Sequence, residues 1–159
     1  MVVENMIILL DIDGVLVMTP AWRITEQHSD GFLKFNSKAE KNLIRLISET
    51  NASIVLTTTH RITYSIEKWK EIFNNRGIPV QTIEKVNTRQ TIDKMPDRCI
   101  EIKEWVDNFG TGRQFVIIDD DLSINSLPSE IKEKWVMTKS MIGLDDECTE
   151  RAIRILKAI

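Results

Sequence analysis

Two aspartates separated by one residue stand directly after an apolar run near the start of the chain, in the segment Asp11-Ile12-Asp13-Gly14-Val15. Two carboxylates so close repel each other unless a cation joins them. One carboxylate can attack phosphorus to form an acyl phosphate, while the second protonates the leaving oxygen and then activates water. The pattern predicts phosphoryl-transfer chemistry, with Asp11 as the nucleophile and Asp13 as the general acid and base.

Two more polar clusters follow apolar runs further along the chain. Threonines at 57–59 follow the run 53–56, and aspartates at 119–121 follow the run 115–118. Continuous apolar runs of this length are typical of strands that are buried on both faces of a parallel sheet. In sheets built from βαβ units, ligands bind beyond the carboxyl ends of the strands. The sequence therefore predicts that these clusters meet residues 11–13 at one edge of a sheet.

The acids expected at this edge form an oxygen-rich set without thiols. Such a set suits Mg²⁺, because this ion keeps several waters and binds phosphate oxygens. The charge on a phosphoryl group would be balanced by the ion, by a hydroxyl at the second strand tip and by a Lys or Arg placed opposite. Thr58 is the expected hydroxyl, with Thr57 as the alternative, because the register of the strand tip decides which one faces the phosphate. Asp121 is expected to be a helix N-cap or a solvated loop residue.

Helical patterns separate the apolar runs. Four helices are expected: from Ser37, over residues 66–73, over residues 97–108 and after Asp145. Ser37 and Glu40 form an S-x-x-E pattern that predicts a capping box, and Gly77 suits the left-handed position after the second helix. Weaker strand patterns lie near 80–83 and 135–138. This alternation predicts an α/β fold, with a mostly parallel central sheet between two layers of helices.

The length and charge of the chain limit its class. Its 159 residues and 42% hydrophobic content suit one domain over residues 1–159. Residues 14–35 show no sustained period, so we expect only a small flap there and no full cap domain. The formal net charge is −3 without a long basic run, so binding to bulk nucleic acid is not predicted. A phosphorylated nucleic-acid end stays compatible, because a metal can neutralise one phosphate locally.

The remaining composition is that of an ordinary intracellular domain. Cys99 and Cys148 lie far apart and are expected to be free thiols. The first apolar run, residues 6–10, is too short for a membrane span or a signal peptide. We therefore expect a cytoplasmic protein that does not contact a membrane and needs no obligatory protein partner.

Three segments together resemble the haloacid dehalogenase (HAD) hydrolases. Residues 11–15 match the first motif of these enzymes, D-x-D-G-[TV], residues 55–58 match an apolar strand ending in Ser or Thr, and residues 117–120 match an apolar strand ending in paired acids. The chain is similar to the small, nearly capless HAD domains of Swiss Army Knife RNA repair proteins. That similarity includes Thr58-x-x-Arg61, Arg98-x-x-Glu101-Ile102-x-x-Trp105, Thr138 and Gly143-Leu144. The resemblance implies a Rossmann-like three-layer sandwich.

The resemblance also implies an activity with named residues. It suggests a Mg²⁺-dependent phosphomonoester hydrolase with an aspartyl-phosphate on Asp11 and with Asp13 as the acid and base. It assigns the metal to Asp11, to the backbone of Asp13 and to Asp120, with Asp119 as an alternate ligand or as a residue behind the ligands. The implied substrate is phosphorylated, either a polynucleotide end or a nucleotide, and the similarity to RNA repair proteins favours a nucleic-acid-terminal phosphate.

Several residues near the expected site have more than one interpretation. HAD hydrolases also carry a Lys or Arg in a third motif, between residues 55–58 and 117–120 here. This third-motif cation is Arg98, at the head of a helix as in the closer relatives, or Lys94, which resembles the Lys-Pro start of many relatives. Thr59 is expected to contact substrate from the strand tip. Arg61 either points to the substrate or forms an ion pair at the helix start. Trp22 lies in the expected flap, where an aromatic ring can stack on a substrate base.

Three other expectations concern the two histidines and two alternative functions. His28 and His60 are expected to be surface or packing residues, because isolated histidines mostly are and the carboxylates already fill the chemical roles. One alternative function is a catalytically idle HAD-like module that binds a phosphorylated ligand or a protein partner. Another is a receiver-like phosphoacceptor, but such domains carry their acceptor later in the chain, which argues against it here.

Overall fold

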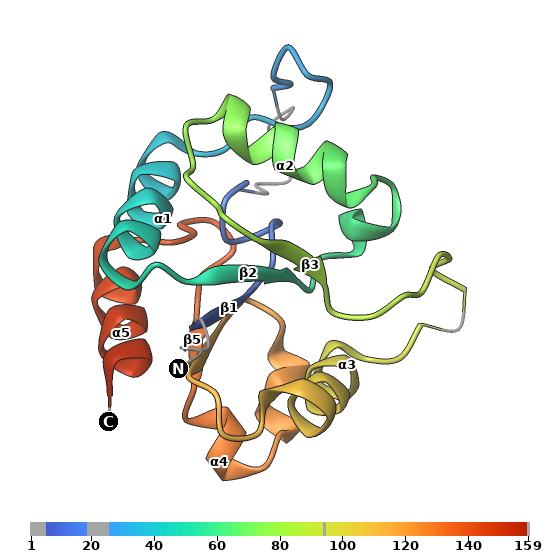
Figure 1. Cartoon of the computed structure of the whole chain (residues 1–159), viewed down its shortest axis with the longest axis vertical. Helices are drawn as coiled ribbons and strands as arrows, with labels where there is room; N and C mark the ends of the chain where they lie inside the picture. Colours follow the sequence, from blue (N-terminus) through green and yellow to red (C-terminus); the bar gives the residue numbers. More distant parts are fainter. Residues whose placement is uncertain (1–5, 19–25, 94, 159) are drawn as a thin grey trace.

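A five-stranded parallel sheet forms the centre of the fold (Figure 1). The computed structural model describes residues 6–18, 26–93 and 95–158. The strands are β1 (Ile7–Leu10), β2 (Ser53–Leu56), β3 (Ile83–Lys85), β4 (Phe115–Asp119) and β5 (Trp135–Met137). Their order in the sheet is β3-β2-β1-β4-β5. The chain thus builds one half of the sheet outward from β1 and then returns to build the other half, which creates a topological switch point between β1 and β4.

Helices cover both faces of this sheet, as Figure 1 shows. One face carries α1 (Ser37–Thr50), α2 (Ile66–Asn75) and α5 (Asp146–Lys157), and the other carries α3 (Arg98–Trp105) and the short α4 (Ser129–Lys132). Short helical segments lie between these elements: η1 (Thr59–Ile62) and η3 (Leu122–Ser126) are 3₁₀-helices, and η2 (Val106–Gly110) is a π-helical segment that directly continues α3. The predicted three-layer α/β sandwich is confirmed. Within the described ranges, no domain is inserted between the strands and helices.

The apolar run of β1 shows why this layering forms. Ile8 and Leu10 pack into the core beneath α1, α2 and α5, whereas Ile7 and Leu9 pack into the core on the α3 side. Every residue of the strand is therefore buried, which explains the continuous rather than alternating apolar pattern. None of the helices in the described ranges has the length and apolar composition needed to cross a bilayer.

Some local boundaries differ from the sequence prediction. The predicted capping box at Ser37 is wrong: Asn36 is the N-cap of α1, and its side chain accepts hydrogen bonds from the amides of residues 38 and 39. The third strand begins at Ile83, later than expected, and the N–H of Val80 donates to the Ile78 carbonyl in a local turn at 2.9 Å instead of to the sheet. Gly77 has the predicted left-handed backbone, with φ of 72°. The two cysteines are free thiols, as predicted.

A buried ion pair anchors the loop before α1. Gln27 and Leu33 form an antiparallel bridge around Asp30. The Asp30 carboxylate accepts hydrogen bonds from Arg76, at the end of α2, at 2.6 and 3.2 Å. Both side chains are only 2% exposed. Burial alone would raise the pKa of Asp30, but the hydrogen bonds from Arg76, Asn75 and a backbone N–H outweigh it and hold the pKa far below its usual range.

We expect Asp30→Asn to lower the free energy of unfolding by about 3–5 kcal/mol at neutral pH, because it leaves the buried Arg76 guanidinium without its counter-charge. Since the pKa of Asp30 is lower in the folded state, its contribution is present above its unfolded pKa and is lost as the pH falls below about 4. Urea unfolding at pH 7 and at about pH 3 measures both effects. Glu26→Gln is the matched control, because Glu26 forms an exposed pair with Lys34 on the same loop; an equal loss in both variants would contradict the prediction.

Candidate active site

Three acids meet at the switch point between β1 and β4. Asp11 directly follows β1, Asp119 ends β4 and Asp120 follows it. One carboxylate oxygen from each of them lies within 4.8 Å of the other two. Asp11 and Asp119 are buried, and Asp120 is half-buried. The predicted convergence of the first and last acidic motifs is therefore present, and the cluster reaches solvent through Asp120.

Gly14 allows the chain to turn directly against this cluster. Its φ is 80°, and a Cβ atom at this position would lie 2.1 Å from Oδ2 of Asp120. Any side chain here would be strained and would displace the carboxylate. On the other side of the turn, the Thr138 hydroxyl donates to the Gly14 carbonyl at 2.8 Å. The loop of the first motif is thus held between Asp120 and the residue that follows β5.

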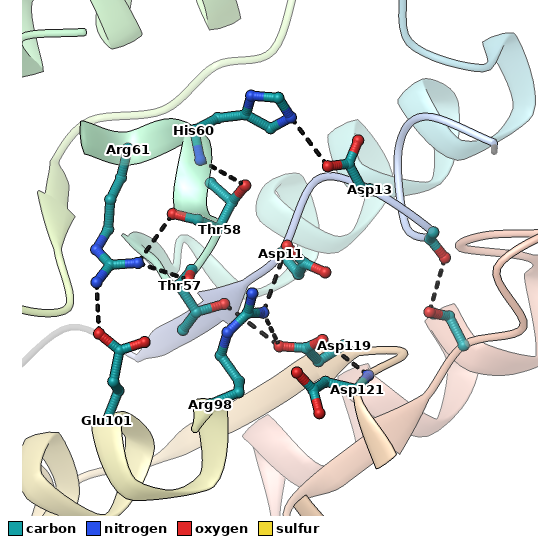
Figure 2. A network of polar contacts seen from close by, with 12 residues as sticks. Asp11, Asp13, Thr57, Thr58, His60, Arg61, Arg98, Glu101, Asp119 and Asp121 are labelled. Carbon is teal, nitrogen blue, oxygen red and sulfur yellow. Dashed lines mark hydrogen bonds and ion pairs between the residues drawn. The ribbon is translucent and has the colours of Figure 1, made fainter. Parts of the chain in front are cut away.

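Arg98, the first residue of α3, lies against the two buried acids (Figure 2). Its Nη1 atom is 2.6 Å from Oδ2 of Asp119 and 3.4 Å from Oδ1 of Asp11. Arg98 thus places a cation beside the two buried acids, and its assignment as the cation of the third HAD motif stays a prediction. The alternative candidate, Lys94, lies outside the described residues.

The three carboxylates carry more negative charge than Arg98 balances. Burial, and then repulsion from Asp119, raise the pKa of Asp11 well above its ordinary value, although Arg98 opposes the shift. Burial and Asp119 likewise raise the pKa of Asp120. Burial alone would lower the pKa of Arg98, but Asp119 and Asp11 outweigh it and the net shift is upward. The remaining repulsion would be relieved by a cation bound among the acids.

This donor set fits Mg²⁺. All three donors are carboxylate oxygens, the ligand type that a hard divalent ion prefers, and Asp120 is half-buried, so the cluster has a side in contact with solvent. The Asp13 carboxylate is not one of the three. It is 45% exposed and is directed away from Asp119 in Figure 2. Any contact of Asp13 with the ion would therefore come from its backbone, as the sequence resemblance implied.

His60 contacts the Asp13 carboxylate directly, which the sequence analysis missed. Its Nε2 atom lies 2.9 Å from Oδ2 of Asp13. The imidazole also packs edge-on against Phe32, with the ring centroids 5.3 Å apart. His60 is therefore a packing residue, as expected, and at the same time a partner of the predicted acid and base. Its position two residues after Thr58, at the same strand tip, is the sequence signal that points to it.

The hydroxyls at the tip of β2 face two different groups. Thr58 Oγ1 accepts the N–H of His60 at 3.2 Å and donates to no other side chain or carbonyl of the described residues, so its hydrogen can be donated to a phosphate oxygen. Thr57 Oγ1 donates to Asp119 at 3.5 Å. Thr59 begins η1 and is exposed. The predicted N-cap role of Asp121 is confirmed, since its carboxylate accepts the N–H of Ser123 at the start of η3.

Arg61 lies behind the strand tip instead of facing the substrate. Its guanidinium is fully buried and forms an ion pair with Glu101 at 2.5 Å. It also donates to the carbonyls of Thr57 and Thr58, each at 3.0 Å. Of the two roles considered for Arg61, the structure shows the ion pair, because burial removes its charge from the reach of a ligand. Trp22, whose ring was expected to stack on a substrate base, lies outside the described residues.

A parallel sheet of this order, with a D-x-D-G turn after β1, a hydroxyl at the tip of β2 and paired acids at the tip of β4, defines a small HAD-like domain. The comparison with protein families agrees: residues 7–148 match the family described as the HAD domain in Swiss Army Knife RNA repair proteins, and the chain belongs to this family. A search among curated proteins finds no match. Family membership makes a phosphatase-type hydrolase the expected class of activity.

Mg²⁺ should stabilise the protein through the acid cluster. An ion concentration about ten times the Kd adds about 1.4 kcal/mol, or roughly 3–6 °C in Tm. The Asp120→Asn variant should have a higher Tm than wild type without metal, because one repulsive charge is gone, and should lose most of the Mg²⁺-dependent rise. Differential scanning calorimetry with and without Mg²⁺ measures both changes.

Asp107→Asn provides the matched control, since Asp107 is exposed and forms its ion pair with Lys103, away from the acid cluster. Its Mg²⁺-dependent rise should equal that of wild type. An Asp120→Asn variant that keeps the full rise would show that Mg²⁺ binds elsewhere.

Proposed function

We propose that the protein is a Mg²⁺-dependent phosphomonoester hydrolase that forms an aspartyl-phosphate on Asp11. The convergence of buried Asp11 with Asp119, Asp120 and Arg98 is the observation that carries this proposal. Asp11, Asp120 and Asp119 would hold the ion, with the backbone of Asp13. When bound, Mg²⁺ would neutralise the acids and the phosphoryl oxygens, so that an anionic nucleophile can approach an anionic substrate.

In the first half of the reaction, a carboxylate oxygen of Asp11 attacks phosphorus and the bond from phosphorus to the leaving oxygen breaks. Asp13 gives its proton to that leaving oxygen. Thr58 donates its free hydroxyl hydrogen to a phosphoryl oxygen, and the guanidinium of Arg98 balances the charge of the group. The product alcohol then leaves, and the phosphoryl group stays on Asp11.

In the second half, the Asp13 carboxylate takes a proton from a water molecule, and the water oxygen attacks phosphorus. The bond between phosphorus and Asp11 breaks, which releases inorganic phosphate and restores the carboxylate. Asp13 ends the cycle protonated, as it began. The exposure of Asp13 supports this double role, because the group must meet both the leaving oxygen and the incoming water.

His60 would act as a positioning residue for Asp13. The contact at 2.9 Å, together with the packing of the imidazole on Phe32, holds the Asp13 carboxylate away from the acid cluster. One carboxylate is thereby kept out of the group of acids that surrounds Asp11. The two aspartates of the first motif then take separate tasks although they are two residues apart.

The substrate that we propose is a phosphorylated nucleic-acid end. The described residues contain no inserted domain that would close over a substrate, so a polymer end has access to the acids. The family to which the chain belongs is described as a HAD domain found in RNA repair proteins. A nucleotide would meet the same catalytic groups, so oligonucleotides and mononucleotides should be compared directly.

Asp11→Asn should lower kcat for phosphomonoesters by at least about 10³-fold, because the amide is a poor nucleophile. EDTA should abolish wild-type turnover, and added Mg²⁺ should restore it. Phosphate release from phosphorylated oligonucleotides, mononucleotides, sugar phosphates and phosphopeptides measures both effects. Asp107→Asn should keep the wild-type rate.

A folded Asp11→Asn variant with wild-type activity would refute the nucleophile assignment. Absence of turnover on the whole set of esters, with Mg²⁺-dependent binding of one of them, would instead favour an idle phosphate-binding module.

His60→Ala should lower kcat by about tenfold with little change in KM, because a misplaced general acid loses part of its usual 10²- to 10⁴-fold effect. The loss should be smaller for p-nitrophenyl phosphate, whose leaving group needs no proton, than for an alkyl phosphate. His60→Gln should recover part of the activity, since it can still donate to Asp13. An equal loss for both esters would show that His60 acts only through the general structure.

A further inference from the structure

A groove beside the site is not used by the proposed mechanism. It lies between the turn that joins η1 to α2 and the segment after β3, and its volume is about 780 Å³. Its lining includes Tyr64, Lys85, Asn87, Arg89 and Gln90. Pockets of roughly 300–1,000 Å³ are typical of sites for small ligands and cofactors. The groove is therefore large enough to hold part of a substrate beyond its phosphate.

The position of the groove connects it with Asp11. It begins at the carboxyl end of β3, and Asp11 follows the carboxyl end of β1. β3 is the second strand from β1 in a parallel sheet, so the two strand ends are roughly 10 Å apart. A substrate with its phosphate at Asp11 reaches the groove by extending along the same edge of the sheet.

The groove is lined by two cations and one acid, in a chain whose net charge is negative. Lys85 and Arg89 line it, and neither forms an ion pair with any residue in the described ranges. Glu84 is the one acid of the lining. In a chain of net charge −3, two unpaired cations in one groove favour an anionic ligand.

The buried Arg61 contacts the lining of the groove, because its Nη2 atom donates to Oδ1 of Asn87 at 3.1 Å. Burial chiefly lowers the pKa of Arg61, Glu101 opposes this, and the charges of Arg98 and Arg89 add to the lowering, so both of these cations lie close enough to act on Arg61. Arg98 and Arg61 are paired with acids. Among these three arginines, Arg89 is thus the one whose charge is left for a ligand.

We propose that this groove binds the strand of a polynucleotide whose terminal phosphate lies at Asp11, with Lys85 and Arg89 on a phosphodiester group. This inference rests on the proposed function, and it names the part of the chain that receives the polymer. The amide of Gln90 supplies contacts to sugar and backbone, which position a strand without reading its sequence, whereas the Asn87 amide is bonded to Arg61 and Glu101.

The test compares two double variants with the same change of charge. Lys85→Gln/Arg89→Gln removes both cations of the groove, and Arg151→Gln/Lys157→Gln removes two exposed cations of α5, on the sheet face opposite α3. The substrates are a phosphorylated single-stranded oligonucleotide, the corresponding mononucleotide and a phosphopeptide. Binding of an unphosphorylated oligonucleotide, measured by fluorescence anisotropy over a range of salt concentrations, does not depend on turnover.

The groove variant should raise the oligonucleotide KM by roughly tenfold and leave the mononucleotide KM within about twofold. The slope of log Kd against log salt should fall by about 0.7 for each phosphate that the variant no longer neutralises. Equal oligonucleotide affinities for the two double variants, or a KM increase confined to the phosphopeptide, would overturn the inference. If wild type hydrolyses no ester, the proposed function fails, and the anisotropy measurement still decides whether the groove binds a strand.

Discussion

The mutual repulsion of three carboxylates at the ends of two neighbouring strands is the constraint on which the rest of this site depends. Asp11 must be charged to act as a nucleophile, yet burial and Asp119 raise its pKa and favour its protonated form. Arg98 offsets only part of this repulsion. In the mechanism that we propose, a cation bound among the acids would favour the charged form of Asp11, so ion binding would also activate the nucleophile.

The fold prevents the acids from relaxing apart. β1 and β4 are hydrogen-bonded neighbours whose residues are buried on both faces, so their ends cannot separate without exposing apolar core. Neighbouring elements tie down the loops: Trp135 Nε1 donates to the Asp119 carbonyl at 3.0 Å, and Thr138 holds Gly14. Arg61 does the same for the tip of β2. The sheet and these hydrogen bonds therefore hold the three carboxylates close together, and a bound ion would relieve the repulsion between them.

Within residues 6–18, 26–93 and 95–158, no inserted domain covers the edge of the sheet that gathers the acids. Phosphate chemistry needs only the atoms around phosphorus, so the acid cluster by itself accepts many esters. In our proposal, selection among them depends on the groove beyond β3, which is lined by Lys85 and Arg89. A contact with the strand in this groove would give the domain a preference for one class of substrate without an inserted cap.

The sequence by itself determined the sheet, its parallel direction and the meeting of Asp11 with Asp120, because apolar runs and strand–helix alternation are local patterns that force the strand ends to one edge. Only the tertiary structure decided how side chains from separate elements pair: His60 with Asp13, and Arg61 with Glu101 instead of with substrate. Such pairs depend on packing geometry and rotamers between distant segments, which spacing along the chain does not encode.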